Sequence, residues 1–282
     1  MSQSSNIGAV ESFYETHPIS EKQIRDKLKA EGVDLSRLTE DILQSHDQDH
    51  FGGTGANDIL AARADIDEGV GVLDVCSGLG GPARYLAQNY DCRVTGVDLT
   101  ESRVEGARRL TALTGLDDRA NFVSGDALAL PFEDRRFDVV IAQEAFCHIP
   151  NKPRLVAECA RVLKPGGRIA FTDILATDTT AEATRVRLTR EMAFNELGSF
   201  ALYRSLLEDS GCAVVQVDDL GREWTKILVD RLAMYRSLKD QTIERFGAAH
   251  FETWDRAYSF FVAQYATGEL SGGRFLARRV AN

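Results

Sequence analysis

Five short apolar runs alternate with amphipathic segments between residues 69 and 175. The runs cover residues 70–75, 93–99, 120–126, 137–143 and 167–174. The segments between them, at 83–90, 101–115 and 152–163, carry apolar residues at helical spacing. Continuous apolar strands that alternate with helices are typical of a parallel sheet covered on both faces. The pattern therefore predicts a doubly wound α/β domain.

The two flanks of this region have different patterns. Residues 1–66 are polar, with helical segments at 8–15, 19–31 and 55–64 and a loop at 46–53, and we expect them to form an N-terminal helical cap. Residues 67–175 form the core. Residues 176–282 predict helices over 180–196, 200–210, 223–246 and 250–267, with strands over 212–220 and 274–280. We expect these late strands to complete a seven-stranded sheet, and the helices to form a lid between the fifth and sixth strands.

Composition narrows the classes of partner. The formal net charge is −10, with 33 Lys and Arg against 43 Asp and Glu, which argues against a nucleic-acid partner. No apolar run approaches the roughly 18 residues of a membrane helix, and the N-terminus lacks the pattern of a secretory signal. The five cysteines form no CxxC pair, and His46 and His50 lie where no helix is predicted. We therefore expect a cytoplasmic protein that binds neither a metal nor a membrane.

The most informative motif is LDVCSGLGG, residues 73–81, at the end of the first predicted strand. Open α/β sheets bind ligands at the carboxyl ends of their strands, and glycines there let the backbone approach the ligand. Packing alone could also require these glycines. However, Asp98 follows the second strand, twenty residues after Gly78, where a carboxylate can accept the hydroxyl hydrogens of a ribose. Asp126 follows the third strand and could accept a hydrogen from an adenine amino group or cap the next turn.

Together with QEAFCHI (143–149) and LKPGGR (163–168), these motifs resemble, in order, those of the class I S-adenosylmethionine-dependent methyltransferases. The resemblance implies a Rossmann-like sheet whose last strand is antiparallel, and S-adenosylmethionine as cofactor with S-adenosylhomocysteine as product. It implies that the cofactor is held by Asp74, Ser77, Gly78, Gly80, Asp98, Leu99, Asp126, Ala127 and Gln143. Cys76 departs from the family pattern, which usually has a glycine at that position.

A narrower resemblance rests on YETHP (14–18), HFGG (50–53), QEAFCHI and DLGREW (219–224), which are similar to segments of small-amine methyltransferases. The relevant groups are the phosphoethanolamine and the sarcosine/dimethylglycine N-methyltransferases. This resemblance implies that His148 is a general base, that Glu144 orients it and that Tyr14 closes over the site. An amine must lose a proton before it accepts a methyl group, and imidazole titrates in a suitable range. Alternatively, His148 only caps the loop before Pro150.

We therefore expect methyl transfer to a small polar molecule, at an amine nitrogen, by a monomer or a homodimer. The alternative is an O- or C-methyltransferase that acts on a small secondary metabolite. A nicotinamide-dependent oxidoreductase and a nucleotide-binding module without activity are the competing classes. Arg185, Arg187 and Arg190 are spread around their predicted helix, which disfavours a phosphorylated substrate. Trp224 and Tyr235 are candidates either for a substrate cavity or for the core.

Overall fold

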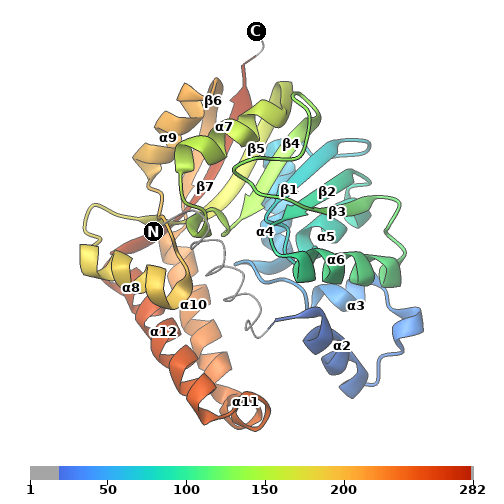
Figure 1. Ribbon diagram of the computed structural model, residues 1–282, viewed down its shortest axis with the longest axis vertical. Helices are drawn as coiled ribbons and strands as arrows, with labels where there is room; N and C mark the ends of the chain where they lie inside the picture. The colour runs from blue at the N-terminus through green and yellow to red at the C-terminus, as the bar shows by residue number, and fades with distance from the viewer. Residues whose placement is uncertain (1–18, 281–282) are drawn as a thin grey trace.

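A mixed seven-stranded sheet runs through the centre of the molecule (Figure 1). The structure, a computed structural model, describes residues 19–280. The strand order is β3-β2-β1-β4-β5-β7-β6, and β7 runs antiparallel to β5 and β6. The strands are β1 Gly71–Val75, β2 Arg93–Asp98, β3 Ala120–Ser124, β4 Phe137–Gln143, β5 Leu163–Ala176, β6 Cys212–Asp219 and β7 Leu270–Arg279. The predicted Rossmann-like sheet with an antiparallel last strand is confirmed.

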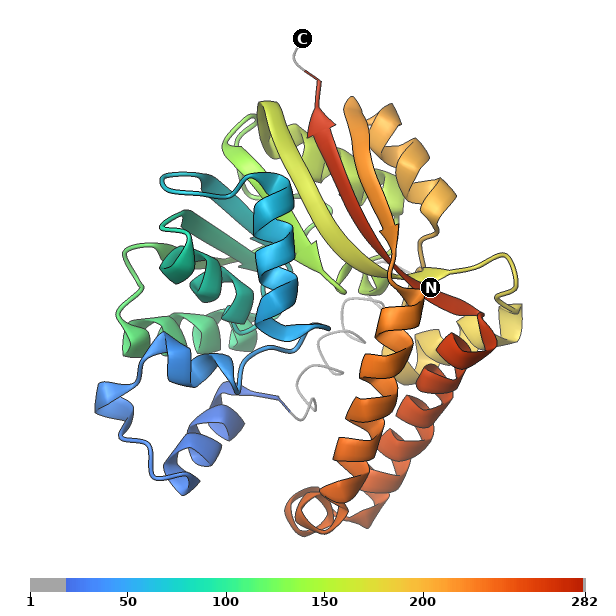
Figure 2. The same ribbon diagram turned by 180° about the vertical axis from the view of Figure 1, so that it is seen from behind.

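Helices cover both faces of this sheet because its central strands are apolar on both sides. In β1, Val72 packs with α4, α5 and α6, whereas Leu73 and Val75 pack with α7 and α9 on the other face. The helices are α4 Gly53–Ala64, α5 Gly81–Asn89, α6 Glu101–Thr114, α7 Lys152–Val162 and α9 Phe200–Asp209. Figure 1 shows the face with α7 and α9, and Figure 2 shows α4 lying across the opposite face. The carboxyl ends of the parallel strands are left uncovered by these layers.

The N-terminal cap packs beside the first half of the sheet. It contains α2 (Glu21–Ala30), the short helix η1 (Leu35–Arg37) and α3 (Glu40–Gln44). Ser20 caps the first of these helices, because its hydroxyl accepts a hydrogen bond from the backbone N–H of Gln23 at 3.3 Å. The predicted loop at 46–53 is present, whereas η1 and α3 were not predicted. The helix predicted at 8–15 lies outside the described residues.

A buried arginine joins this cap to the core. Arg84 of α5 is fully buried, and its Nε donates to Glu40 Oε2 at 2.9 Å while Nη2 pairs with the Asp47 carboxylate. Its Nη1 also donates to the backbone oxygen of Leu79 at 2.7 Å. Burial raises the pKa of Glu40 to about 7 and also raises the pKa of Asp47. These charges therefore attach the cap to the sheet layer. Because they are buried, water cannot take the place of a lost partner.

A second helical unit projects beyond the carboxyl ends of the strands, opposite α2 and α3 (Figure 1). We name α8, α10, α11 and α12 the helical arm. They span Glu182–Met192, Gly221–Ser237, Lys239–Phe246 and Ala248–Thr267. Only α8 forms the predicted lid between the fifth and sixth strands, since α9 packs on the sheet and the other three helices lie between β6 and β7. The helix predicted over 223–246 is two helices, divided at Leu238. No helix among residues 19–280 is long and apolar enough to cross a membrane.

We expect Arg84→Met to lower the free energy of unfolding by about 3–5 kcal/mol, because it leaves two buried carboxylates without their partner. Urea unfolding followed by circular dichroism measures this loss. Arg109→Met is the matched control, since the side chain of Arg109 is half exposed and its pair with Glu21 at 2.8 Å is screened by solvent. Equal losses in the two variants would contradict the buried attachment.

Candidate active site

A cavity of about 260 Å³ lies at the carboxyl ends of β1, β2, β4 and β5, where the cap and the helical arm approach the sheet. Most of the residues predicted to form the site line this cavity: Asp74, Ser77, Gly78, Asp98, Leu99, Asp126, Ala127, Gln143, Glu144 and His148. Among the described residues that were predicted for the site, only Gly80 does not line the cavity. Tyr14 lies outside the described residues. The structure therefore brings most of the predicted residues together around one cavity.

The turn after β1 has an unusual backbone. Cys76, Gly78 and Gly80 all adopt a left-handed conformation, with φ of 63°, 55° and 83°. A Cβ on Gly80 would lie 2.5 Å from the ring of Phe122, so this glycine is required by packing rather than by a ligand. Cys76 stands where a glycine was expected. Its left-handed conformation costs about 1–2 kcal/mol in a residue that has a side chain. The shape of the turn is thus retained although the residue differs.

Three buried polar atoms around this turn have no hydrogen-bond partner among residues 19–280. They are Asp74 Oδ2, Ser77 Oγ and Gln143 Nε2, and all three residues line the cavity. Buried polar groups without a partner are rare and cost about 1–3 kcal/mol each. An acceptor, a hydroxyl and an amide donor at one place fit the ammonium and carboxylate groups of an amino acid. This cradle therefore suits the methionine part of S-adenosylmethionine.

The carboxylate at the end of β2 is fixed by backbone donors. Asp98 accepts hydrogen bonds from the N–H groups of Gly78 and Thr100, each at 2.9 Å. Each carboxylate oxygen keeps a further lone pair that can accept a ribose hydroxyl. Burial raises the pKa of Asp98, and it raises the pKa of Asp74 to about 8, to which the neighbouring Asp98 charge contributes. The raised pKa favours a proton on Asp74, and a cationic ligand would favour its loss.

His148 lies on the short helix η2 (Phe146–His148) directly after β4. Its Nδ1 is 3.0 Å from the backbone oxygen of Ala193, so Nδ1 carries the hydrogen and Nε2 keeps a lone pair in the neutral ring. The side chain is buried, and the ring of Phe194 packs edge-on against it at 5.2 Å. The imidazole is thus held from the helical arm in the tautomer that a general base requires.

Two buried charges that the sequence analysis missed hold the segment around His148. Asp173 of β5 accepts the backbone N–H of Cys147 at 2.9 Å and the hydroxyl of Tyr203 at 2.7 Å. Lys152 donates from Nζ to the backbone oxygens of Phe146 and Ile149. Burial raises the pKa of Asp173 to about 6 and lowers the pKa of Lys152. Neither residue touches the cavity, so both act by positioning the turn that does.

Glu144 has a different role from the one expected. Its Oε2 accepts the backbone N–H of Phe51 and its Oε1 accepts the Thr172 hydroxyl, both at 2.6 Å. Both partners belong to other elements, and among the described residues the hydrogen bond of His148 Nδ1 goes to Ala193 and not to Glu144. The expectation that Glu144 orients His148 is therefore corrected: Glu144 connects the 46–53 loop to the sheet. Burial raises its pKa to about 7.

The 46–53 loop is also held from the opposite side by Arg231 of α10. This guanidinium donates to the backbone oxygens of Asp49 and His50 and lies 4.9 Å from the centre of the Phe51 ring. His50 is buried, which lowers its pKa to about 4, and its Nε2 contacts the Gly53 oxygen at 2.9 Å. His46 pairs instead with Glu31. No group of three potential metal ligands occurs among the described residues.

The end of the cavity beyond His148 is mostly apolar and was not predicted. It is lined by Ile174, Met192, Phe194, Trp254, Tyr258 and Phe261. The last three are spaced by four and three residues on α12, so helical periodicity could have placed them on one face. Trp224 and Tyr235 do not line the cavity; they pack against Phe51 and Phe251. Arg185, Arg187 and Arg190 do not line it either.

Comparison with known proteins agrees with this geometry. A family described as "Methyltransferase domain" matches residues 73–171. The chain is 33% identical to a 27-O-demethylrifamycin SV methyltransferase of Amycolatopsis mediterranei over 71% of this chain and 74% of the relative. It is 35% identical to a glycine/sarcosine/dimethylglycine N-methyltransferase of Actinopolyspora halophila over 57% of this chain, which spans only 28% of that relative.

Solved structures with low sequence identity share the fold. A putative sarcosine dimethylglycine methyltransferase from Galdieria sulphuraria is 21% identical with a TM-score of 0.76, over 93% of this chain and 99% of that one. A phosphoethanolamine N-methyltransferase 2 from Haemonchus contortus, in complex with S-adenosyl-L-methionine, is 19% identical with a TM-score of 0.77. That alignment covers 96% of this chain and 60% of the other.

We expect the affinity for S-adenosylhomocysteine to rise between pH 6 and pH 7.5. Asp74 must lose its proton to pair with the ligand's ammonium group, and this costs about 1.4 kcal/mol for each pH unit below its pKa. The range stops at pH 7.5 because the slope flattens as the pH approaches the pKa of Asp74, which is about 8. Isothermal titration calorimetry measures the slope. Asp74→Asn should bind more weakly and with a shallower slope; an unchanged slope would exclude Asp74 as its source.

We expect Glu144→Gln to retain methyl transfer within about threefold, because an amide can accept from Phe51 N–H and donate to Thr172. Glu144→Ala should lose about 1–3 kcal/mol of unfolding free energy and at least tenfold in rate, because both hydrogen bonds disappear. Urea unfolding and a radiolabelled methyl-transfer assay measure the two effects. An activity loss in Glu144→Gln as large as that in Glu144→Ala would show that the negative charge itself is needed.

Proposed function

The chain belongs to the family of S-adenosylmethionine-dependent methyltransferases, and from this premise we propose that it methylates an amine nitrogen of a small molecule. The observation that carries the proposal is the position of His148. This buried imidazole lines the cavity, and its Nδ1 lies 3.0 Å from the Ala193 carbonyl, so the neutral ring carries its basic lone pair on Nε2. The relatives include N-methyltransferases of glycine, sarcosine and dimethylglycine, which supports nitrogen as the acceptor atom.

The cofactor supplies an electrophilic methyl group on a positively charged sulfur. In our proposal the Asp74 carboxylate binds its ammonium group, and Ser77 and Gln143 bind its carboxylate. Asp98 accepts the ribose hydroxyls. One oxygen of Asp126 accepts the backbone N–H of Leu128 at 2.8 Å, which leaves the other for the adenine amino group. Leu99 and Ala127 line the cavity with apolar atoms that suit the faces of the adenine ring.

The acceptor side has three tasks, and the described residues can perform each. An ammonium group has no lone pair, so His148 Nε2 takes its proton and the Ala193 oxygen stabilises the resulting imidazolium through Nδ1–H. Methyl transfer is a displacement in line with the breaking bond, so the acceptor must be held within roughly 3 Å of the methyl carbon. The apolar residues beyond His148 exclude the water that would compete for the same space.

A hydroxyl oxygen is the second candidate acceptor atom. One observation favours it: the relative aligned over 74% of its own length is a 27-O-demethylrifamycin SV methyltransferase. The same histidine could take a hydroxyl proton, so the geometry of the base does not separate the two atoms. A screen with radiolabelled S-adenosylmethionine against amines, amino acids, phenols and other alcohols tests the proposal. Mass spectrometry of the products identifies the methylated atom, and heat of binding with NAD but none with S-adenosylhomocysteine would contradict the whole assignment.

We expect His148→Ala to lower kcat by about 10²–10⁴, the range for loss of a proton-transfer group. Its affinity for S-adenosylhomocysteine should stay within about twofold, because the proposed cofactor residues lie on other elements. Steady-state kinetics and calorimetry measure the two quantities. His250→Ala is the matched control, since His250 lies on α12 and does not line the cavity. A loss below threefold in His148→Ala would show that the acceptor enters already deprotonated.

A further inference from the structure

A continuous line of aromatic rings extends from His148 along one wall of the cavity. Phe194 meets His148 at 5.2 Å and Phe261 at 5.4 Å between ring centres. Tyr258 lies 5.8 Å from Phe261, and Trp254 lies 6.4 Å from Tyr258. We name Phe194, Phe261, Tyr258 and Trp254 the aromatic file. All four line the cavity, together with the apolar side chains of Ile174 and Met192.

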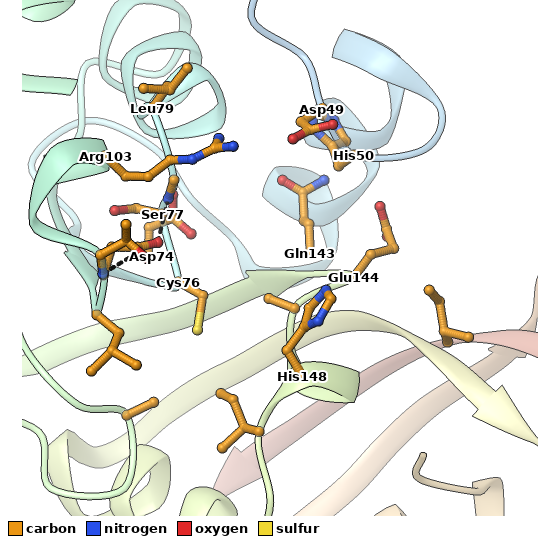
Figure 3. A pocket seen from close by; sticks show the side chains of 18 of the residues that line it. Asp49, His50, Asp74, Cys76, Ser77, Leu79, Arg103, Gln143, Glu144 and His148 are labelled. Carbon is orange, nitrogen blue, oxygen red and sulfur yellow. Dashed lines mark hydrogen bonds between the residues drawn. The ribbon is translucent and has the colours of Figure 1, made fainter. Parts of the chain in front are cut away.

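The charged groups at this end do not form a site for an anion. Within the described chain, the arginines that line the cavity are Arg103 and Arg231. Arg231 donates to two backbone oxygens and lies over the Phe51 ring. Arg103 lies on the side of Asp74 and Ser77, away from His148 (Figure 3). A carboxylate or phosphate on the acceptor would be buried among aromatic rings and near the acidic side chain of Glu144, which is unfavourable without converging donors.

We propose that the acceptor has a neutral, ring-bearing apolar body that lies along the aromatic file, with its reacting amine at the His148 end. The inference rests on the proposed function and names its substrate class. It replaces the small polar body expected from the sequence by an apolar one. Aromatic walls favour a planar ring through offset or edge-on packing, and the ring removes apolar surface from water. A small zwitterionic amino acid would gain neither contribution.

Two secondary amines that differ in a single substituent test this inference. Sarcosine carries a carboxylate where N-methylbenzylamine carries a phenyl ring. With the full chain and radiolabelled S-adenosylmethionine, kcat/KM should be at least tenfold higher for N-methylbenzylamine. Calorimetry in the presence of S-adenosylhomocysteine should detect binding of N-methylbenzylamine and not of sarcosine at equal concentration. Methylation of sarcosine at an equal or higher kcat/KM overturns the inference and leaves the methyltransferase function standing.

The residues of the aromatic file give the second part of the test. Trp254→Ala should raise KM for N-methylbenzylamine about tenfold and change kcat little, because Trp254 contacts the body of the acceptor and not the reacting atom. Phe246→Ala is the control, since this partly exposed ring lies on α11 outside the cavity and should have no effect. Equal effects of the two variants overturn the inference.

The outcomes separate the inference from the proposed function. If S-adenosylhomocysteine binds but no amine is methylated while benzyl alcohol is, nitrogen is wrong as the acceptor atom and the apolar body is supported. If N-methylbenzylamine binds beside S-adenosylhomocysteine without turnover, the apolar body is supported and the proposed reaction fails. If N-methylbenzylamine and benzyl alcohol neither bind nor react, whereas sarcosine or another carboxylate-bearing amine does, the inference is overturned.

Discussion

The position of His148 depends on two charges that are buried behind it. Asp173 and Lys152 are both removed from water, and removal of a charge from water costs several kcal/mol unless it is paired and hydrogen-bonded. Here each charge binds the turn that follows β4: the carboxylate takes the N–H of Cys147, and the ammonium group takes the carbonyls of Phe146 and Ile149. An apolar pair of the same size would fill this space, but it would remove the side-chain partners of the Cys147 N–H and the Ile149 carbonyl, whereas the Phe146 carbonyl also accepts from the N–H of Ile149. The charges therefore fix one backbone conformation, and with it the place of the imidazole.

The rest of the cavity depends on a loop that is held from two sides. Glu144 on the sheet takes the N–H of Phe51, while Arg231 on the helical arm donates to the carbonyls of Asp49 and His50. The same three-residue stretch, 49–51, therefore contacts both the end of β4 and the helix that faces it. Because Glu144 directly follows Gln143 of the cradle, a displacement of the loop would affect the cofactor end and the acceptor end together. A methyltransferase benefits from this coupling, since both substrates must be held before the displacement can occur.

Local patterns were sufficient for the sheet, and most of the residues they proposed for the cofactor line one cavity. The strands are buried on both faces, so they appear as apolar runs, and Asp98 and Asp126 follow strand ends whose position in a parallel sheet is set by the fold. The function of Glu144 was not accessible in this way, because it depends on a hydrogen bond across 93 residues of sequence. Asp173 lies inside a strand, and nothing local distinguishes a positioning carboxylate there from a surface one. The prediction of the lid was only partly correct, because the order of the helices along the chain does not indicate which of them extend beyond the sheet.

The acceptor end shows most clearly why sequence periodicity alone cannot define a substrate site. Trp254, Tyr258, Phe261 and Tyr265 lie on one face of α12, and by spacing alone they form a single apolar stripe. The structure divides this stripe. Tyr265 is buried in the core that joins the helical arm to β7, whereas Trp254 and Tyr258 lie farther from the sheet and line the cavity. The stripe is divided at the level where the sheet ends, and the position of that end is a property of the whole fold. The cradle of Asp74 and the turn of His148 belong to other elements, so a change along this stripe can alter which acceptor fits without moving the groups that hold the cofactor or take the proton.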